Sequence, residues 1–241
     1  MIERLRIEIS SFEQMNQLII YDIRRYVFIA FMIGYSFSSL SQIGNDKLNI
    51  TMELTLPSGR ANAPYRAYLN GLVNVQPKLQ WKFAQDWFGA FGPKYSYYTV
   101  SEFKVPEKMN GGAHTYGGFV ELGWHKWQNE RLAIEIGCKT GLAQTAFITT
   151  LTRETGIQRV TAMYVEPTFS LILASDEAIA YRWIMGYNIS GYDFKPYHLG
   201  LQTNGGYKIE DFNKPSQSFI IGFGMSYYFG NKRSDPFLDE N

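Results

Sequence analysis

The sequence has almost no excess charge of either sign and almost no cysteine. Its 241 residues carry 23 Lys and Arg against 22 Asp and Glu, a formal net charge of +1. Because sequence-independent binding of a nucleic-acid backbone needs a broad basic surface, this balance argues against nucleic acid as a partner. The single cysteine, Cys138, excludes an intramolecular disulfide and a thiolate-rich zinc site. No spacing of His or carboxylate residues indicates another metal site, so we expect no metal and no cofactor.

Long hydrophobic runs are also missing. The longest apolar stretch, residues 26–37, falls short of the roughly 20 residues that a membrane-spanning helix needs. Arg24 and Arg25 precede it, and a small-x-small sequence ending at Ser41 follows it. A cationic start, a short apolar centre and a small-residue end predict a secretory signal peptide cleaved after Ser41. The alternative, a buried amphipathic helix, is disfavoured because the stretch is apolar on all sides.

Aromatic residues and glycine, in contrast, are abundant, and alternating patterns among them predict strands. Aromatics make up 16% of the chain, with 17 Tyr, 17 Phe and 22 Gly. In the clearest segment, apolar residues stand at every second position from Phe219 to Phe229, a period of two that is typical of a strand. Eight such segments follow one another: residues 48–56, 73–83, 87–98, 117–127, 131–142, 160–173, 179–190 and 218–229.

Two of these segments open alike, with Val75-Gln-Pro77 and Val165-Glu-Pro167, which favours a repeated hairpin. Proline cannot donate a backbone hydrogen bond. We therefore expect a bulge or an interruption of the strand pairing at Pro77 and at Pro167.

The connectors between the segments alternate between short and long. The short ones are residues 84–86, 128–130 and 175–177, and the long ones are residues 57–71, 99–116, 147–159 and 191–217. This pattern places all long loops at one end of an up-and-down antiparallel sheet. Outer-membrane barrels have this anatomy, with short periplasmic turns and long extracellular loops.

The two faces of the segments differ in a way that favours a membrane barrel. The apolar faces are rich in aromatics at the strand ends, for example Trp124 and Trp127, as at bilayer interfaces. The opposite faces carry small residues and charges of both signs that could neutralise one another inside a narrow lumen. The predicted polar network of the lumen is Glu53, Lys78, Lys82, Lys94, Glu121, Glu135, Lys139, Glu166 and Arg182. A soluble secreted calyx that binds a hydrophobic ligand is an alternative, with the two faces exchanged.

The predicted fold class is therefore all-β: an up-and-down antiparallel transmembrane β-barrel, with eight strands, after a cleaved N-terminal signal peptide. The domain organisation is a signal peptide over residues 1–41, an outer-membrane β-barrel over residues 42–229 and a short polar periplasmic tail over residues 230–241. Residues 1–14 lie upstream of the usual signal layout, so translation starting at Met15 is an alternative.

On these segments the chain resembles the small eight-stranded outer-membrane β-barrels of the OmpA/OmpX type, in particular the Bacteroidetes-like outer membrane protein β-barrel domain. The resemblance implies an integral protein of the bacterial outer membrane. It also implies contact with outer-membrane lipid and lipopolysaccharide, and recognition by the barrel-assembly machinery through the last strand, which ends at Phe229. The polar tail after Phe229 departs from the usual terminal Phe. An extracellular protein or glycan is a further partner that long loops favour.

Some barrels of this wider class are enzymes that modify lipid A, and histidine is one of the residues that such enzymes use for catalysis. His114 and His198 are placed in long loops, and His125 is placed on the inner face near the periplasmic rim. None is followed by the Ser-Asn that the deacylase pattern contains. His198 and His114 are thus only weak catalytic candidates, and we expect a non-enzymatic structural, adhesion or surface-contact role. An enzyme modifying lipid A or phospholipid is the runner-up.

Aromatic residues are dense in the predicted loops. Two interpretations remain open: the side chains form a contact surface for a protein or glycan, or they pack the loops together. The residues assigned to surface contact are Tyr65, Tyr68, Tyr192, Phe194 and Tyr197.

Overall fold

The computed structural model describes residues 48–105, 108–129, 131–175, 178–202 and 206–229. The predicted signal peptide, residues 1–41, and the predicted tail, residues 230–241, lie outside these ranges. Within them, no helix has both the length and the apolar character needed to cross a membrane.

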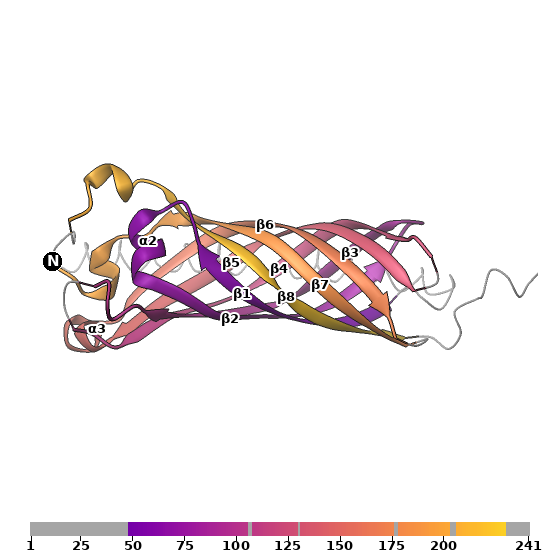
Figure 1. Ribbon diagram of the computed structural model, residues 1–241, viewed down its shortest axis with the longest axis horizontal. Coiled ribbons are helices and arrows are strands. Elements are labelled where there is room, and N and C mark those ends of the chain that lie inside the picture. Colours follow the sequence, from indigo (N-terminus) through magenta and orange to yellow (C-terminus); the bar gives the residue numbers. More distant parts are fainter. Residues whose placement is uncertain (1–47, 106–107, 130, 176–177, 203–205, 230–241) are drawn as a thin grey trace, which may run out of the picture. The chain divides into compact units, whose positions relative to one another are not determined.

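Eight strands form one closed antiparallel barrel, in which each strand pairs with its neighbours in the sequence and β8 pairs with β1 (Figure 1). The strands are β1 (Leu48–Gly59), β2 (Leu69–Lys82), β3 (Trp87–Val100), β4 (Gly111–Trp127), β5 (Leu132–Thr149), β6 (Gln158–Ala174), β7 (Ile179–Asp193) and β8 (Pro215–Phe229). This arrangement confirms the predicted fold class and strand number.

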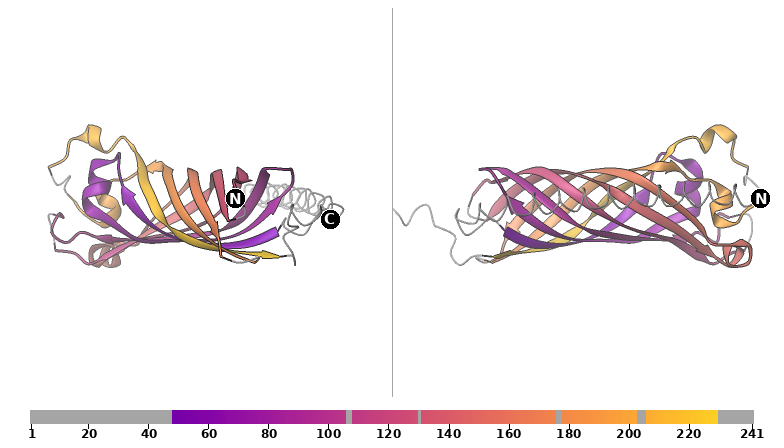
Figure 2. Two further views of the ribbon diagram at one scale, coloured as in Figure 1. Left: turned by 45° about the vertical axis from the view of Figure 1, so that its right-hand side comes forward. Right: turned by 180° about the vertical axis from the view of Figure 1, so that it is seen from behind.

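Short helices lie at one end of the described barrel, and the strands are joined by short turns at the other (Figures 1 and 2). The helices are α2 (Ala63–Tyr68), α3 (Thr150–Thr155), and the 3-10 turns η1 (Pro196–Leu199) and η2 (Ile209–Asp211). Side-chain caps start two of them: Asn62 accepts a hydrogen bond from the Tyr65 amide, and Thr149 accepts one from the Thr152 amide. We call the end of the barrel that carries these helices the loop end and the opposite end the turn end.

The strands reach further toward the loop end than the sequence pattern predicted. β5 continues to Thr149 instead of residue 142, and β4 begins at Gly111 instead of residue 117. Residues 145–149, which are rich in β-branched and aromatic side chains, extend the pairing of β5 with β4. The loops are accordingly shorter than expected, and part of each predicted loop belongs to a strand of the barrel wall.

The two prolines interrupt the strand pairing on one side only. On β2, Val75 pairs with Tyr95 and Leu79 with Phe91, whereas no pairing with β3 occurs between these positions. The register is the same on both sides of the gap, and Pro77 remains aligned with β1. A matching gap separates β6 from β7 at Pro167. The expected disturbance is therefore an interruption without a bulge.

Apolar side chains point outward and polar ones inward. On β1, Leu54 is 56% exposed while the adjacent Glu53 is 2% exposed, and on β8 Phe223 is 70% exposed. This polarity agrees with the predicted membrane barrel and is opposite to that of a soluble calyx with an apolar interior. One expectation was wrong: Trp127 lies on the inner face with Tyr228, because its position along β4 has the parity of His125.

The apolar outer surface has the height of a hydrocarbon layer. On β8 it runs from Phe229 to Phe219, and ten residues of a strand tilted by about 40° rise roughly 25 Å. Outer-membrane barrels carry an apolar band of about this height.

Candidate functional site

The lumen contains a connected network of charged side chains. Eight of the nine predicted residues belong to it, four acids and four bases, so its formal charge is zero. They come from every strand from β1 to β7: Glu53, Lys78, Lys94, Glu121, Glu135, Lys139, Glu166 and Arg182. The ninth, Lys82, is half-buried on the same face of β2 near the turn end.

Lys78 connects three of the acids. Its Nζ atom lies 2.8 Å from Glu53, 2.7 Å from Glu121 and 3.5 Å from Glu135. Among the described residues, Lys78 is the only base within 4 Å of Glu121. Because a buried carboxylate is costly without a partner, the charge of Glu121 is stabilised chiefly by this lysine, which forms its ion pair.

Lys139 and Lys94 hold the remaining acids nearer the loop end. Lys139 Nζ lies 2.5 Å from Glu53 and 3.6 Å from Glu166, and it also donates to the amide oxygen of Gln76. Lys94 Nζ lies 2.6 Å from Glu166. Since β5 and β1 lie on opposite sides of an eight-stranded barrel, the bond from Lys139 to Glu53 crosses the lumen.

Arg182 closes the network toward the turn end. It forms an ion pair with Glu135 through its guanidinium and donates through Nε to Ser226 at 2.6 Å, which brings in the remaining strand, β8. Glu135 also lies 3.1 Å from Nδ1 of His125. His125 is therefore on the inner face near the turn end, where the sequence placed it.

Uncharged polar side chains complete these contacts, and the sequence analysis did not single them out. The Gln76 amide donates to Glu166 at 2.9 Å, and the Gln80 amide donates to Glu135 at 2.8 Å. The Asn188 amide donates to Glu166 at 2.9 Å. All three have the inward parity of their charged neighbours, and this signal was available in the sequence.

The side chains of the network fill the lumen. Each of its eight charged residues is at most 6% exposed, so the described part of the interior holds no wide aqueous channel at this level. Nor does the described chain contain a group of three His, Cys, Asp or Glu residues that could hold a metal ion. The network therefore connects the strands to one another across the lumen.

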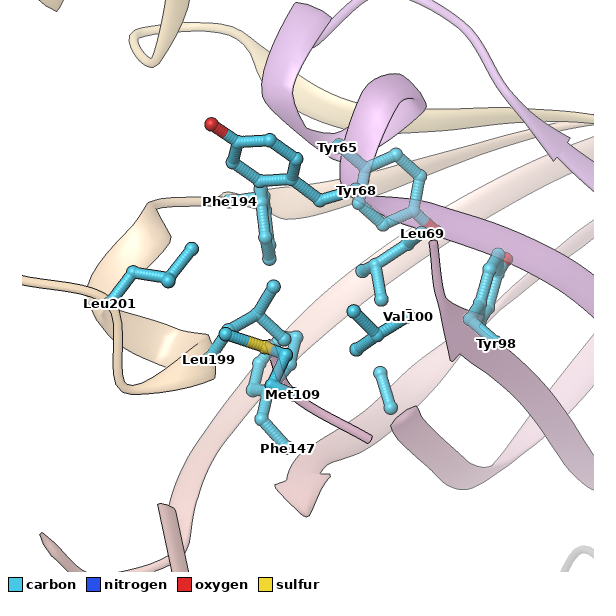
Figure 3. Packing of buried hydrophobic residues seen from close by; sticks show 11 residues of the cluster. Tyr65, Tyr68, Leu69, Tyr98, Val100, Met109, Phe147, Phe194, Leu199 and Leu201 are labelled. Carbon is cyan, nitrogen blue, oxygen red and sulfur yellow. The ribbon is translucent and has the colours of Figure 1, made fainter. Parts of the chain in front are cut away.

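Above the network, the loop end is closed by an apolar cap. Buried side chains from α2, from η1, from the segments between the elements and from the strand ends nearest the loops pack together there (Figure 3). The cap consists of Tyr65, Tyr68, Leu69, Tyr98, Val100, Met109, Ala113, Phe147, Phe194, Leu199 and Leu201.

The cap corrects the assignment of surface-contact residues. Tyr65, Tyr68 and Phe194 are buried in it and cannot contact an external partner, because the loops converge over the barrel mouth and exclude water from these rings. Tyr192 is half-buried beside the cap. Tyr197, at 55% exposed, remains accessible. For three of the five residues, loop packing was thus the correct one of the two interpretations.

His198 is part of the same cap. Its ring stacks on Phe147 with centroids 5.1 Å apart, and its Nδ1 accepts a hydrogen bond from the Lys195 amide at 3.1 Å. Burial, reinforced by the charge of Lys195, lowers the pKa of His198 to about 4. In the described structure, no carboxylate or hydroxyl nucleophile is hydrogen-bonded to this histidine, so the geometry of a catalytic pair is missing here.

His114 lies on β4 and not in a loop, because β4 begins earlier than predicted. Its side chain has the outward parity, and its Nδ1 is 3.0 Å from the hydroxyl of Tyr95. Among the described residues this hydroxyl is its one hydrogen-bond partner. The two weak catalytic candidates therefore lie in different places: His114 is on the outer wall and His198 is in the cap.

Together, a closed antiparallel barrel, an apolar exterior and a charge-neutral, filled interior define the class of protein as a transmembrane β-barrel.

No family model matches the chain, and no curated protein is similar to it in sequence. Among solved structures, it is similar to Ail, the attachment invasion locus protein of Yersinia pestis, with 10% identity and a TM-score of 0.47 over 77% of this chain and 100% of Ail. It is also similar to Neisserial surface protein A (NspA), with 11% identity and a TM-score of 0.48 over 76% of this chain and 97% of NspA. A further structure of Ail holds the heparin analogue sucrose octasulfate. At these identities the likeness concerns the fold alone.

Proposed function

We propose that the chain is an integral protein of the bacterial outer membrane, with the turn end in the periplasm and the loop end outside the cell. The observation that supports this is the inverted polarity of the barrel, since an exposed apolar band about 25 Å high is stable only in lipid. Export through the predicted signal peptide and insertion by the barrel-assembly machinery, which would recognise β8 ending at Phe229, belong to the same proposal.

Its role is non-enzymatic: it stabilises the envelope and contacts an extracellular protein or glycan through the four loops. The filled lumen leaves the loops and the outer wall as the surfaces available for contact. Three of the loops expose large apolar side chains at their surface: Phe103, which is fully exposed, Ile157 and Tyr197. Exposed aromatics of this kind are typical of contact surfaces.

Membrane location is tested by fractionation and by heat-modifiable gel migration of the expressed protein. Orientation is tested by cysteine labelling, because the chain has a single cysteine. In a Cys138→Ser background, Lys104→Cys at the loop end and Gln128→Cys at the turn end, both exposed residues, are treated with a membrane-impermeant maleimide on intact cells. We expect labelling of the first only. A soluble periplasmic product, or labelling of the second alone, contradicts the proposal.

The contact role is tested by binding of whole cells that express the protein to immobilised glycans and to host-cell layers. Phe103→Ser and Tyr197→Ser are expected to reduce binding, whereas the exposed Asn213→Ala serves as a matched control at the same end. If both serine variants bind like the unmodified protein, these loops do not form the contact surface.

A further inference from the structure

The outer wall of β3 to β6 carries a group of polar side chains that neither the lumen nor the cap uses. Strand register places Tyr95, Tyr116, Gln144 and Thr161 directly opposite one another in one row across the four strands. With His114 and Arg159, which belong to the next row toward the loop end, they form what we call the wall site.

Hydrogen bonds hold these side chains in place on the outer surface. The hydroxyl of Tyr95 lies 3.0 Å from Nδ1 of His114. The hydroxyl of Tyr116 donates to Gln144, and the Gln144 amide donates to Thr161 at 3.1 Å. Since these five side chains are already oriented, only Arg159 would lose much side-chain entropy when a ligand binds.

Two hydrogen-bonding groups at the wall site have no partner. Within the described ranges, neither Nε2 of His114 nor the guanidinium of Arg159 bonds to another residue. The two residues are separated by one strand, so their backbones lie about 10 Å apart. A guanidinium beside an imidazole is suited to an anionic oxygen group such as a phosphate, and the aromatic rings of Tyr95 and Tyr97 offer flat surfaces for a sugar.

Below the wall site, toward the turn end, the surface is apolar and contains a low point at Gly118. A Cβ atom there would meet only the carbonyl oxygen of Gly92, at 3.7 Å, so backbone packing does not require a glycine. Leu142 stands directly opposite Gly118 on β5 and is 59% exposed. A shallow apolar strip beneath polar groups has the layout that an acyl chain and its headgroup need.

The height of the wall site agrees with this layout. His114 is ten residues along β4 from Trp124, which corresponds to roughly 25 Å and so to the full height of the apolar band. The polar groups therefore stand at the level of lipid headgroups on the loop side.

We propose that the wall site binds the phosphorylated sugar headgroup of an outer-leaflet glycolipid, with Arg159 and His114 at the phosphate and an acyl chain lying along Gly118. This inference rests on the proposed location in the outer membrane, and it names one lipid-binding position on the barrel. The pair of strands next to the site, β7 and β8, offers a comparison, because Tyr187 on β7 is likewise a tyrosine hydrogen-bonded to a glutamine, Gln217 on β8, at 2.6 Å.

The test uses the full chain in phosphatidylethanolamine nanodiscs that contain a small fraction of diphosphorylated lipid A. The lipid retained after extraction is measured by native mass spectrometry. We expect one lipid A per barrel, and the double variant His114→Ala/Arg159→Gln should retain about tenfold less, the loss expected for one or two charge-assisted hydrogen bonds. Tyr187→Phe should retain as much as the unmodified protein.

Dephosphorylated lipid A provides the second arm, and it should be retained as weakly by the unmodified protein as lipid A is by the double variant. Equal retention of both lipids, or equal retention by the double variant, overturns the wall site. Heat-modifiable migration checks that each variant is inserted. If the unmodified protein itself never inserts, the proposed function fails; if it inserts but shows no selectivity, only the wall site fails.

Discussion

The dependence of Glu121 on Lys78 gives the sharpest prediction about the stability of the barrel. Lys78→Met removes the base that lies 2.7 Å from Glu121 and leaves that buried carboxylate with no described cation within 4 Å. Breaking a buried pair by removing one partner costs about 3 to 5 kcal/mol, and we expect about 4 kcal/mol here because Lys78 serves three acids. Lys139→Met should cost less, about 3 kcal/mol, because Glu53 keeps Lys78 and Glu166 keeps Lys94.

A second substitution separates the charge effect from the loss of packing. Lys78→Met/Glu121→Gln restores the balance of charges, since Glu53 keeps Lys139 and Glu135 keeps Arg182. The double variant should therefore regain at least half of the lost stability, or about 2 kcal/mol. As a matched control, Lys126→Met changes an exposed lysine at the turn end and should stay within about 0.5 kcal/mol of the unmodified protein.

The free energy of unfolding is measured by urea titration of the protein in lipid vesicles, followed by tryptophan fluorescence and gel mobility. The reasoning is refuted if Lys78→Met costs less than about 1 kcal/mol, or if adding Glu121→Gln makes the barrel less stable still.

Three other predictions concern the wall and the cap. Leu54→Arg, near the middle of the apolar band, should destabilise the inserted barrel by about 2 to 4 kcal/mol, and Leu48→Arg, at the edge of the band, by at most about 1 kcal/mol. The same vesicle assay measures both, and equal costs would contradict the lipid-facing assignment. The pKa of His198 is lowered to about 4 from 6.5, so the cap should be fully stable above pH 6.5, lose stability as the pH falls toward 4 and lose no more below that. Hydrogen exchange of the loop between β7 and β8 measures this profile. A profile unchanged by His198→Gln rejects the prediction. Leu199→Ala should open the cap locally at a cost of about 2 to 5 kcal/mol while heat-modifiable migration persists, whereas the exposed Tyr197→Ala should have little effect on proteolysis of that loop.

The barrel could be predicted from the sequence because its signal is local. Each strand needs only alternate apolar residues, as from Phe219 to Phe229, and the parity of a charged residue such as Glu53 then determines which face it occupies. The interruptions at Pro77 and Pro167 were predictable for the same reason, since a missing backbone donor acts where it stands.

The pairing partners inside the lumen were not predictable in this way. Lys139 bonds to Glu53, 86 residues away, and this contact depends on the stagger of strands that are not adjacent. Strand order brings β1 and β5 to opposite sides of the lumen, but only the three-dimensional closure decides which rows of side chains meet across it.

The cap was misjudged because loop residues have no periodicity to indicate a face. Tyr65 and Phe194 look like exposed loop aromatics in the sequence, yet their rings lie 5.7 Å apart in the cap. One cue was present: Asn62 followed by Pro64 is typical of a helix start, and a short helix with buried tyrosines must pack on something.

The interior and the exterior of this barrel have opposite designs. Inside, the charged network is neutral and its members bond to one another, and the apolar cap covers the loop end. The hydroxyls of Tyr68 and Tyr164 are buried without a hydrogen-bond partner in the described structure, but no charged group of the network is left unpaired there. Outside, His114 and Arg159 carry hydrogen-bonding groups at the edge of the apolar band that no other described residue uses. These hydrogen-bonding groups can gain a partner from the lipid headgroups beside them. We therefore expect specific contacts on the outer wall at this level and at the exposed loop tips.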